Sequence, residues 1–195
     1  MQTILITGGA GFIGSNLADR LLKEKYNVIA IDNFDDFYDP AIKRNNISMA
    51  LTRPGYTFIE SDVCNTDFLL NVLPAGISGI IHLAAKAGVR SSIINPQGYE
   101  ENNIQCLTNA LELAVKLNIT QFVFASSSSI YGNSKHIPFN ENLSDLNPLN
   151  PYAKSKLSSE QIGMIFSEKY DINFITLRFF SVYGSRLRPD LIRAC

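Results

Sequence analysis

The sequence predicts one α/β domain, spanning residues 1–195, in which a doubly wound parallel sheet is flanked by helices. Three observations support this fold class. Short apolar segments rich in β-branched and aromatic residues alternate with segments of helical periodicity, as strand–helix–strand crossovers require. Most of the apolar segments are continuous rather than alternating, which is typical of strands covered on both faces. A glycine-rich turn joins the first strand to the first helix, as in ligand-binding folds of this class.

The elements follow one another along the chain in a regular order. Strands are expected at Thr3–Thr7, Val28–Asp32, Tyr56–Glu60, Gly79–Leu83, Gln121–Ala125 and Asn173–Phe179. Helices are expected at Phe12–Lys25, Asn103–Leu117 and Tyr152–Tyr170, where apolar residues recur at spacings of three and four. The segment 136–151 carries three prolines and is predicted to be a long loop.

Composition excludes several classes of function. The 17 Lys and Arg residues against 18 Asp and Glu residues leave a net charge of −1, which argues against a dominant nucleic-acid or anionic-membrane surface. No apolar segment approaches the roughly 20 residues of a membrane-spanning helix, and the N-terminus lacks the features of a signal peptide. The three cysteines are scattered, so we expect reduced thiols and a cytoplasmic protein.

The turn after the first strand has the pattern of a dinucleotide site. Gly8, Gly11 and Gly14 recur at every third residue. They would allow a tight turn, a close approach of a pyrophosphate to the backbone, and close packing of helix on sheet, respectively. Asp32 ends the second strand, where its carboxylate would accept hydrogen bonds from the adenosine ribose and repel a 2′-phosphate. This Rossmann-like arrangement therefore predicts NAD rather than NADP as the cofactor.

A second group of residues indicates proton-transfer chemistry. Tyr152 and Lys156 lie four residues apart at the start of a predicted helix, so both side chains share one face. A neighbouring ammonium lowers the pKa of a tyrosine and makes it a usable base. Ser126–Ser129 follow the fifth strand, and a hydroxyl at that strand end would meet the ligand. Tyr131, in the Tyr-Gly pair that follows these serines, is expected to pack or to line the substrate site rather than to act as the base.

The motifs TGGAGFIGSNL, IDNF, HLAAKAGVR, SSSSIYG, PYAKSK and LRFFSVYG occur in the order found in nucleotide-sugar epimerases. The chain therefore resembles the extended short-chain dehydrogenase/reductases. The AGVR-S segment and the FFSVYG…RPD ending are most similar to the UDP-glucuronate 4-epimerase branch. The resemblance covers essentially the whole chain.

The resemblance implies a set of site residues. Ser127, Tyr152 and Lys156 align with the catalytic positions, and Ser127, Ser129 and Ser181 with hydroxyl positions near the sugar. Either Asn102 or Asn103 is the asparagine that contacts the cofactor; we assign Asn102 while the doublet leaves the choice open. The cofactor site comprises Gly8, Gly11, Phe12, Ile13, Gly14, Asp32, Asn33, Phe34, Asp62, Val63, Leu83, Ala84, Ala85, Lys86, Asn102, Tyr152, Lys156 and Phe180.

Two departures from the family pattern stand out. Cys106-Leu107 replace the Gly-Thr pair that usually follows the asparagine. Relatives also continue for more than a hundred further residues that supply most substrate contacts, so we expect a truncated chain that lacks most of its C-terminal substrate-binding lobe. That lobe carries the selectivity, and the sugar is left unnamed.

The resemblance implies C4 epimerisation of a UDP-sugar of the UDP-glucuronate or UDP-glucose type through a transient 4-keto intermediate. The tyrosine takes the hydroxyl proton while NAD accepts and returns the hydride. One alternative is a sugar 4,6-dehydratase, which is disfavoured because Ser127–Ser129 contain no carboxylate where dehydratases carry Thr-Asp-Glu. The other alternative is a non-catalytic NAD-binding fragment.

Other chemistry finds little support in the sequence. His82 is expected to be a satisfied core histidine, and His136 lies in the long loop. No His, Cys, Asp or Glu residues have metal-site spacing, so no metal is expected. The resemblance implies a homodimer formed through the helices Asn103–Leu117 and Tyr152–Tyr170, which the sequence alone does not establish.

Overall fold

A computed structural model describes residues 1–143 and 145–187. The Arg188-Pro189-Asp190 segment and Cys195, which the sequence analysis used, lie outside these residues. Six parallel strands form one sheet in the order β3-β2-β1-β4-β5-β6. Their bounds are β1 Thr3–Thr7, β2 Asn27–Asp32, β3 Tyr56–Glu60, β4 Ile77–His82, β5 Gln121–Ser127 and β6 Asn173–Phe179.

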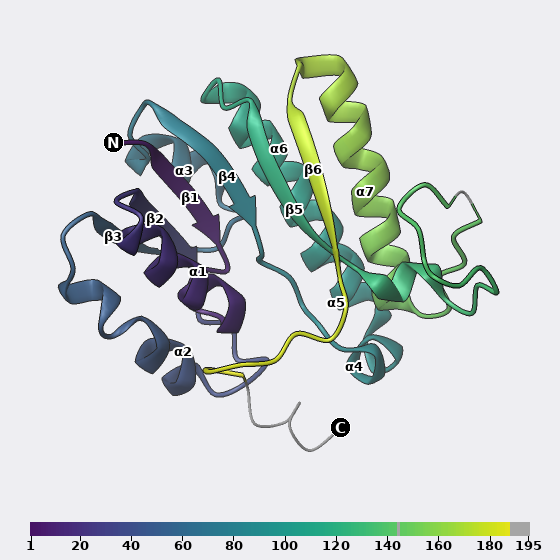
Figure 1. Cartoon of the computed structure of the whole chain (residues 1–195). Helices are drawn as coiled ribbons and strands as arrows, with labels where there is room; N and C mark the ends of the chain where they lie inside the picture. The colour runs from purple at the N-terminus through teal and green to yellow at the C-terminus, as the bar shows by residue number, and fades with distance from the viewer. Residues whose placement is uncertain (144, 188–195) are drawn as a thin grey trace.

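Helices cover both faces of the sheet, as Figure 1 shows. On one face lie α3 (Thr66–Val72), α6 (Cys106–Lys116) and α7 (Pro151–Tyr170), which bury the largest apolar cluster with β4 and β5. On the other face lie α1 (Phe12–Lys23) and α2 (Pro40–Ile47). This second layer does not extend over β6, where Ile175 and Leu177 remain 44% and 40% exposed.

Shorter helices lie near the carboxyl ends of the strands: α4 (Val89–Ile94), α5 (Pro96–Glu100), the π-helix η2 (Glu101–Gln105) and the 3₁₀ helix η3 (Ser128–Tyr131). A further 3₁₀ helix, η1 (Ala50–Thr52), precedes β3 at its amino end. The π-helix leads directly into α6, so the predicted helix Asn103–Leu117 starts inside it.

The fold prediction is confirmed, and the topology explains where a ligand can bind. The chain leaves β1 toward β2 on one side of the sheet and later returns to β4 on the other side of β1. A crevice opens at such a switch point, outside the carboxyl ends of the two strands. No helix in the described ranges is long and apolar enough to cross a membrane.

Candidate functional site

A cleft of about 660 Å³ lies at this switch point. Its wall contains most of the residues expected to bind the cofactor or the sugar. They are Gly8, Gly11, Phe12, Ile13, Gly14, Asp32, Asn33, Asp62, Val63, Leu83, Ala84, Ala85, Lys86, Asn102, Ser127, Tyr152, Lys156, Phe180 and Ser181. Phe34 and Ser129 are the two expected site residues that do not line it.

The glycine turn forms the floor of the cleft because side chains would not fit there. Gly8 has a φ of +69°, and a Cβ atom at this position would lie 2.8 Å from the backbone nitrogen of Ala84. A Cβ atom on Gly14 would collide with the carbonyl oxygen of Gly8. Helix α1 begins at Phe12, and its N-cap Gly11 makes no side-chain capping bond. The N–H groups of its first turn therefore face the cleft without a capping side chain and are suited to binding phosphate.

Asp32 is built into the turn rather than solvated. The residue is 8% exposed, and its carboxylate accepts hydrogen bonds from the backbone N–H groups of Ala10 (3.1 Å) and Phe34 (2.9 Å). The Nζ atom of Lys43 lies 3.7 Å from its Oδ1 atom and donates to the carbonyl of Asp35 at 2.9 Å. Sequence analysis missed Lys43, which enters the site from α2. The available signal in the sequence was the Asp39-Pro40 pair, which marks the start of the helix that carries Lys43.

Phe34 occupies a different place from the one expected. Its side chain is 6% exposed and packs with Ala10, Ile47 and Phe58 beneath the site. Only its backbone N–H takes part, through the bond to Asp32. A positive φ of 50° turns the chain at this residue, so the side chain points into the core rather than toward the cleft.

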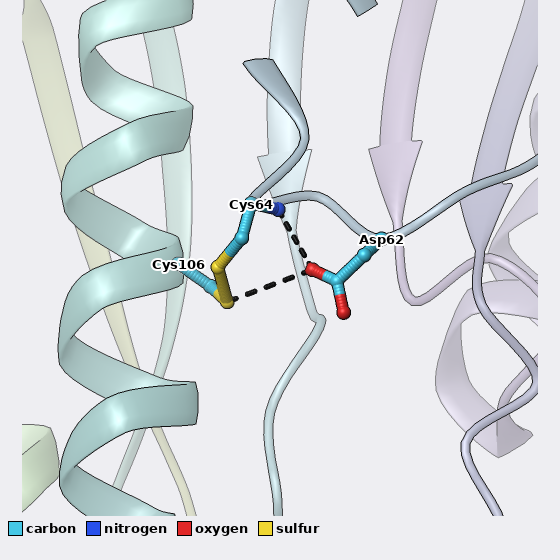
Figure 2. Close-up of side chains that lie close together, drawn as sticks. All are labelled: Asp62, Cys64 and Cys106. Atoms are coloured by element: carbon cyan, nitrogen blue, oxygen red, sulfur yellow. Dashed lines mark hydrogen bonds between the residues drawn. A yellow bond between two sulfur atoms is a disulfide. The ribbon is translucent and has the colours of Figure 1, made fainter. Parts of the chain in front are cut away.

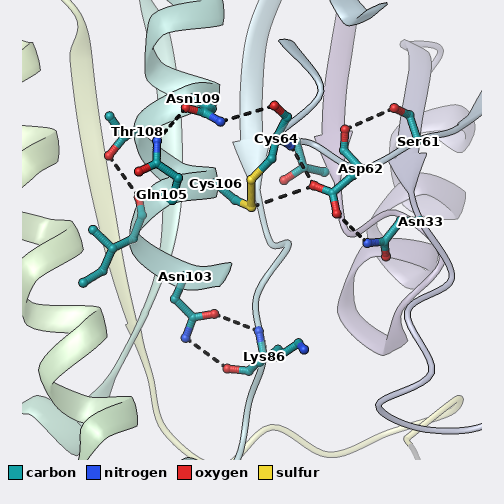
Figure 3. The surroundings of a disulfide bond; sticks show 12 residues. Asn33, Ser61, Asp62, Cys64, Lys86, Asn103, Gln105, Cys106, Thr108 and Asn109 are labelled. Carbon is teal, nitrogen blue, oxygen red and sulfur yellow. Dashed lines mark hydrogen bonds between the residues drawn. A yellow bond between two sulfur atoms is a disulfide. The ribbon is translucent and has the colours of Figure 1, made fainter. Parts of the chain in front are cut away.

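Asn102 and Asn103 lie on different sides of the π-helix and make different contacts. Asn103 is 2% exposed, and its amide bonds the backbone N–H and C=O groups of Lys86 at 2.8 and 3.1 Å (Figure 3). It also donates to the Ser155 hydroxyl at 3.1 Å. Asn103 thus fixes the segment after β4, while Asn102 lines the cleft.

Tyr152 and Lys156 project from the first turns of α7 into the same cleft as Ser127. The ammonium of Lys156 donates to the carbonyl of Ala125 at 2.8 Å and lies 5.9 Å from the centre of the Tyr152 ring. Burial lowers the pKa of Lys156 to about 8, an effect that the nearby Glu160 carboxylate opposes. The geometry therefore brings a base candidate and a cation together at the strand end, four residues apart on one helix face.

The serines at the carboxyl end of β5 form a small hydrogen-bonded group. Ser127 Oγ accepts from both the backbone N–H (3.2 Å) and the hydroxyl (2.9 Å) of Ser129. With these bonds accepted, the Ser127 hydroxyl keeps its own proton for donation into the cleft. Ser129 therefore lies behind Ser127, whereas Ser181 lines the cleft after β6.

An ion pair supports this end of the site from behind. Arg178 on β6 donates to both carboxylate oxygens of Glu160, through Nε at 3.2 Å and Nη2 at 2.9 Å. Glu160 also accepts a short hydrogen bond from the Ser126 hydroxyl. Arg178 donates to the hydroxyl of Tyr131 at 3.2 Å, so Tyr131 is a packing residue of this network, which is one of the two roles expected for it.

His82 is buried, but only half of its hydrogen-bonding capacity is used. Its Nδ1 atom pairs with the Thr7 hydroxyl at 2.9 Å, while its Nε2 atom has no partner in the described structure. Burial, and secondarily the charge of Lys156, lowers its pKa to about 3. The expected core position holds, although this histidine is not fully satisfied.

A family model described as the NAD dependent epimerase/dehydratase family matches residues 4–193. The chain belongs to this family. A UDP-glucuronate 4-epimerase of Thermodesulfobacterium geofontis is 38% identical over 192 residues, which make up 98% of this chain and 59% of that protein. The chain thus spans less than two thirds of the length of this epimerase relative.

Solved structures of epimerase/dehydratase proteins share the fold of this chain. One is UDP-glucuronic acid 4-epimerase from Bacillus cereus in complex with UDP-glucuronic acid and NAD, with a TM-score of 0.87 and 36% identity. It covers 97% of this chain, which in turn covers 60% of that chain. Another is DesIV, a dTDP-glucose 4,6-dehydratase from Streptomyces venezuelae with NAD bound, with a TM-score of 0.88, 29% identity, and coverages of 97% and 59%.

The cleft fits the dinucleotide that the family's description names. The floor has no room for side chains at Gly8 and Gly14, and the first turn of α1 faces the same space. At the other end, the Lys156 ammonium stands beside Tyr152. A volume of about 660 Å³ falls within the range of small-molecule and cofactor sites.

One feature of this epimerase/dehydratase site contradicts the expectation of scattered, reduced cysteines. Cys64 and Cys106 are 42 residues apart in sequence and are joined by a disulfide (Figure 2). The parallel topology brings the loop after β3 against the start of α6, a contact that sequence spacing cannot reveal. These two sulfurs and the Asp62 carboxylate also form a group whose ligand atoms lie within 4.8 Å of one another. The sequence spacing of these three residues did not indicate a metal site, although the fold brings their ligand atoms together. Because the two sulfurs form a disulfide, they are not available as thiolate ligands.

Proposed function

We propose that this chain supplies the NAD-binding and proton-transfer part of an enzyme that inverts C4 of a UDP-sugar of the UDP-glucuronate or UDP-glucose type. The observation that carries the proposal is the convergence of Tyr152, Lys156 and Ser127 on the cleft that begins at the glycine turn. NAD, when bound there, accepts and returns the hydrogen of sugar C4 as a hydride.

The chain's own residues move and hold the proton. Tyr152 takes the proton of the sugar C4 hydroxyl and later returns it to the 4-keto oxygen. Lys156 stabilises the phenolate form of Tyr152 through its charge, and its bond to Ala125 holds the ammonium in position. Ser127, whose oxygen already accepts from Ser129, donates its proton to the reacting oxygen and orients it.

Asp32 and the first turn of α1 give the site its preference for NAD. Asp32 accepts hydrogen bonds from the adenosine ribose, and the N–H groups after Gly11 bind the pyrophosphate. Lys43 lies beside Asp32 and offsets part of its charge. The repulsion of a 2′-phosphate is therefore weaker than Asp32 alone would give. We expect NAD⁺ to bind more tightly than NADP⁺, and NADP⁺ to bind measurably.

A second candidate function is cofactor binding without turnover. The chain covers 59% and 60% of the length of the two UDP-glucuronate 4-epimerases compared above, so binding of the sugar nucleotide has to be tested separately from binding of NAD. A 4,6-dehydratase is disfavoured because Ser127, Ser128 and Ser129 offer no carboxylate for the elimination of water.

The deciding experiment compares Tyr152→Phe with the unchanged chain. Each protein is titrated calorimetrically with NAD⁺ and then incubated with NAD⁺ and UDP-glucuronate, and C4 inversion is followed by chromatography of the sugar nucleotides. We expect Tyr152→Phe to bind NAD⁺ and to lose turnover. Tyr170→Phe, at the far end of the same helix, is the matched control and should retain both properties. Turnover by Tyr152→Phe would refute the role of this tyrosine. NAD⁺ binding without turnover by the unchanged chain would favour the second candidate.

A homodimer and a cytoplasmic location complete the proposal. The exposed Met164 and Ile165 on α7, 55% and 61% accessible, support an interface that uses this helix. Sedimentation velocity of the chain, compared with an Ile165→Glu variant, tests the dimer, since the charge should dissociate it.

A further inference from the structure

The disulfide between Cys64 and Cys106 lies beside the part of the cleft proposed to hold the adenosine end of NAD. Cys64 follows Asp62 and Val63 in the loop after β3, and Cys106 is the first residue of α6 (Figure 3). Cys106 is 4% exposed, and it lines the cleft together with Asp62 and Val63. The bond therefore ties one wall of the cleft to a helix that starts 42 residues later.

A short chain of contacts runs from the disulfide to the ribose end of the cleft. The backbone N–H of Cys64 donates to Asp62 Oδ1 at 2.8 Å, and the Sγ atom of Cys106 lies 3.8 Å from the same oxygen (Figure 2). The other oxygen of Asp62 accepts from the side-chain amide of Asn33 at 2.8 Å. Asn33 directly follows Asp32, so the Asp62 carboxylate is oriented by the disulfide on one side and by the ribose-binding strand end on the other.

We propose that Cys64 and Cys106 form a reversible redox pair whose oxidised form holds the cofactor cleft in its binding-competent shape and whose reduction weakens NAD⁺ binding. This inference rests on the proposed cofactor role of the cleft. Disulfides in cytoplasmic proteins are usually transient and serve catalysis or redox sensing, which fits such a pair.

The chemical step is thiol–disulfide exchange with a dithiol. A thiolate of the dithiol attacks one sulfur of the pair and forms a mixed disulfide, and the other cysteine leaves as a thiolate. The second thiol of the reductant then displaces the remaining cysteine and closes the reductant's own disulfide. Two electrons and two protons pass to Cys64 and Cys106, and the dithiol is oxidised by the same amount. Cys64 is half-buried and Cys106 faces the cleft, so the reductant has an approach from the cleft side.

Reduction should weaken NAD⁺ binding because the disulfide holds the Cys64 loop against α6. Two thiol sulfurs cannot remain at bonding distance, so reduction moves the Cys64 loop away from α6 or turns one side chain into the cleft. Movement of the loop displaces the Cys64 N–H that orients Asp62, and a side chain turned into the cleft occupies space there. A hydrogen bond between loop and helix that does not depend on the disulfide runs from the Asn109 amide to the Cys64 carbonyl, at 3.3 Å. A binding site whose wall must be reordered binds its ligand more weakly.

Thermodynamic linkage makes the effect reciprocal. If reduction weakens NAD⁺ binding by a given factor, NAD⁺ must make the disulfide harder to reduce by the same factor. We expect about a five- to tenfold effect, at the lower end of the range for coupled sites. Since NAD⁺ would also cover the cleft face of Cys106, we expect bound cofactor to slow the reduction.

The test uses the full chain with Cys195→Ser, which removes the third thiol, in an oxidised form and in a form reduced with dithiothreitol, both in the presence of EDTA. Calorimetry gives the NAD⁺ affinity of each form. Alkylation and mass spectrometry give the ratio of dithiol to disulfide in a dithiothreitol buffer with and without NAD⁺. Hydrogen exchange of the amides of residues 62–65, without cofactor, reports on the loop itself. The double variant Cys64→Ala/Cys106→Ala is the control that cannot respond to reductant.

The expected result is weaker binding by the reduced form, the same factor in the thiol equilibrium, faster exchange of the loop amides on reduction, and no response of the double variant. Equal and measurable NAD⁺ affinities in both forms would overturn the redox proposal and leave the proposed cofactor role intact. No NAD⁺ binding in either form would reject both. Free thiols at Cys64 and Cys106 under oxidising conditions would also overturn the redox proposal, even if NAD⁺ binds.

Discussion

Replacing Lys156 by methionine should remove a pH dependence from the stability of the fold. The ammonium is 4% exposed, and burial lowers the pKa of Lys156 from 10.5 to about 8. Between these values the unfolded chain binds the proton and the folded chain does not, so the free energy of unfolding rises with pH. Over the range from pH 7 to pH 10 this group contributes a rise of about 2.5 kcal/mol, at about 1.36 kcal/mol per pKa unit.

Urea unfolding at pH 7, 8, 9 and 10 measures this difference directly. Lys156→Met keeps the length of the side chain and loses the charge, so its profile should lack the rise. The variant also loses the bond to the Ala125 carbonyl. This loss alone contributes a destabilisation of about 1 kcal/mol that does not change with pH and adds to the difference in charge. Lys154→Met, at an exposed position two residues earlier, is the matched control and should follow the unchanged protein. Parallel profiles for Lys156→Met and the unchanged protein would show that the folded state does not hold a destabilised ammonium.

Three further substitutions probe other parts of the site. Glu160→Ala leaves the Arg178 guanidinium without its carboxylate partner and should lower stability by about 3–5 kcal/mol in chemical denaturation, whereas a loss below about 1 kcal/mol would contradict the role of this pair. Gly14→Ala forces a methyl group against the carbonyl of Gly8, so it should lower stability by about 1–3 kcal/mol and abolish measurable NAD⁺ binding. An unchanged NAD⁺ titration would contradict the role of the glycine turn in binding. His82→Leu removes a buried imidazole whose pKa is lowered to about 3, so the unchanged protein should lose about 2.5 kcal/mol more stability than the variant between pH 7 and pH 4.5. Equal acid sensitivity of the two proteins would contradict a neutral, buried His82.

The parts of the fold that could be predicted are those whose causes are local. Short segments rich in β-branched and aromatic residues predicted β1, β3 and β6 with the observed bounds, because such residues favour extended backbone. Burial on both faces was expected too widely, since β3 and β6 are edge strands and remain partly exposed. Helices α1 and α7 were predicted to within two residues at either end. The glycine turn was predictable for the same reason, since the absence of side chains at Gly8 and Gly14 is written in the sequence itself.

The parts that could not be predicted depend on contacts between distant segments. The Asp39-Pro40 pair marks the start of α2, but no local pattern reveals that the Lys43 ammonium meets Asp32. The pairing of Cys64 with Cys106 arises only when β3 and α6 come together. Phe34 has the right position in sequence for the cleft, but a positive φ turns its side chain into the core.

The π-helix between α5 and α6 has a consequence for how this protein tolerates change. A π-turn holds one residue more than an α-turn, and such turns are frequent at functional sites. Deleting one residue within Glu101–Gln105 would let a continuous α-helix form, and the helix would even gain regular hydrogen bonds. The residues before the deletion would then rotate by about 100° relative to α6. Asn102 would leave the cleft or Asn103 would release Lys86, so at this point a more regular helix would make a poorer wall for the cleft.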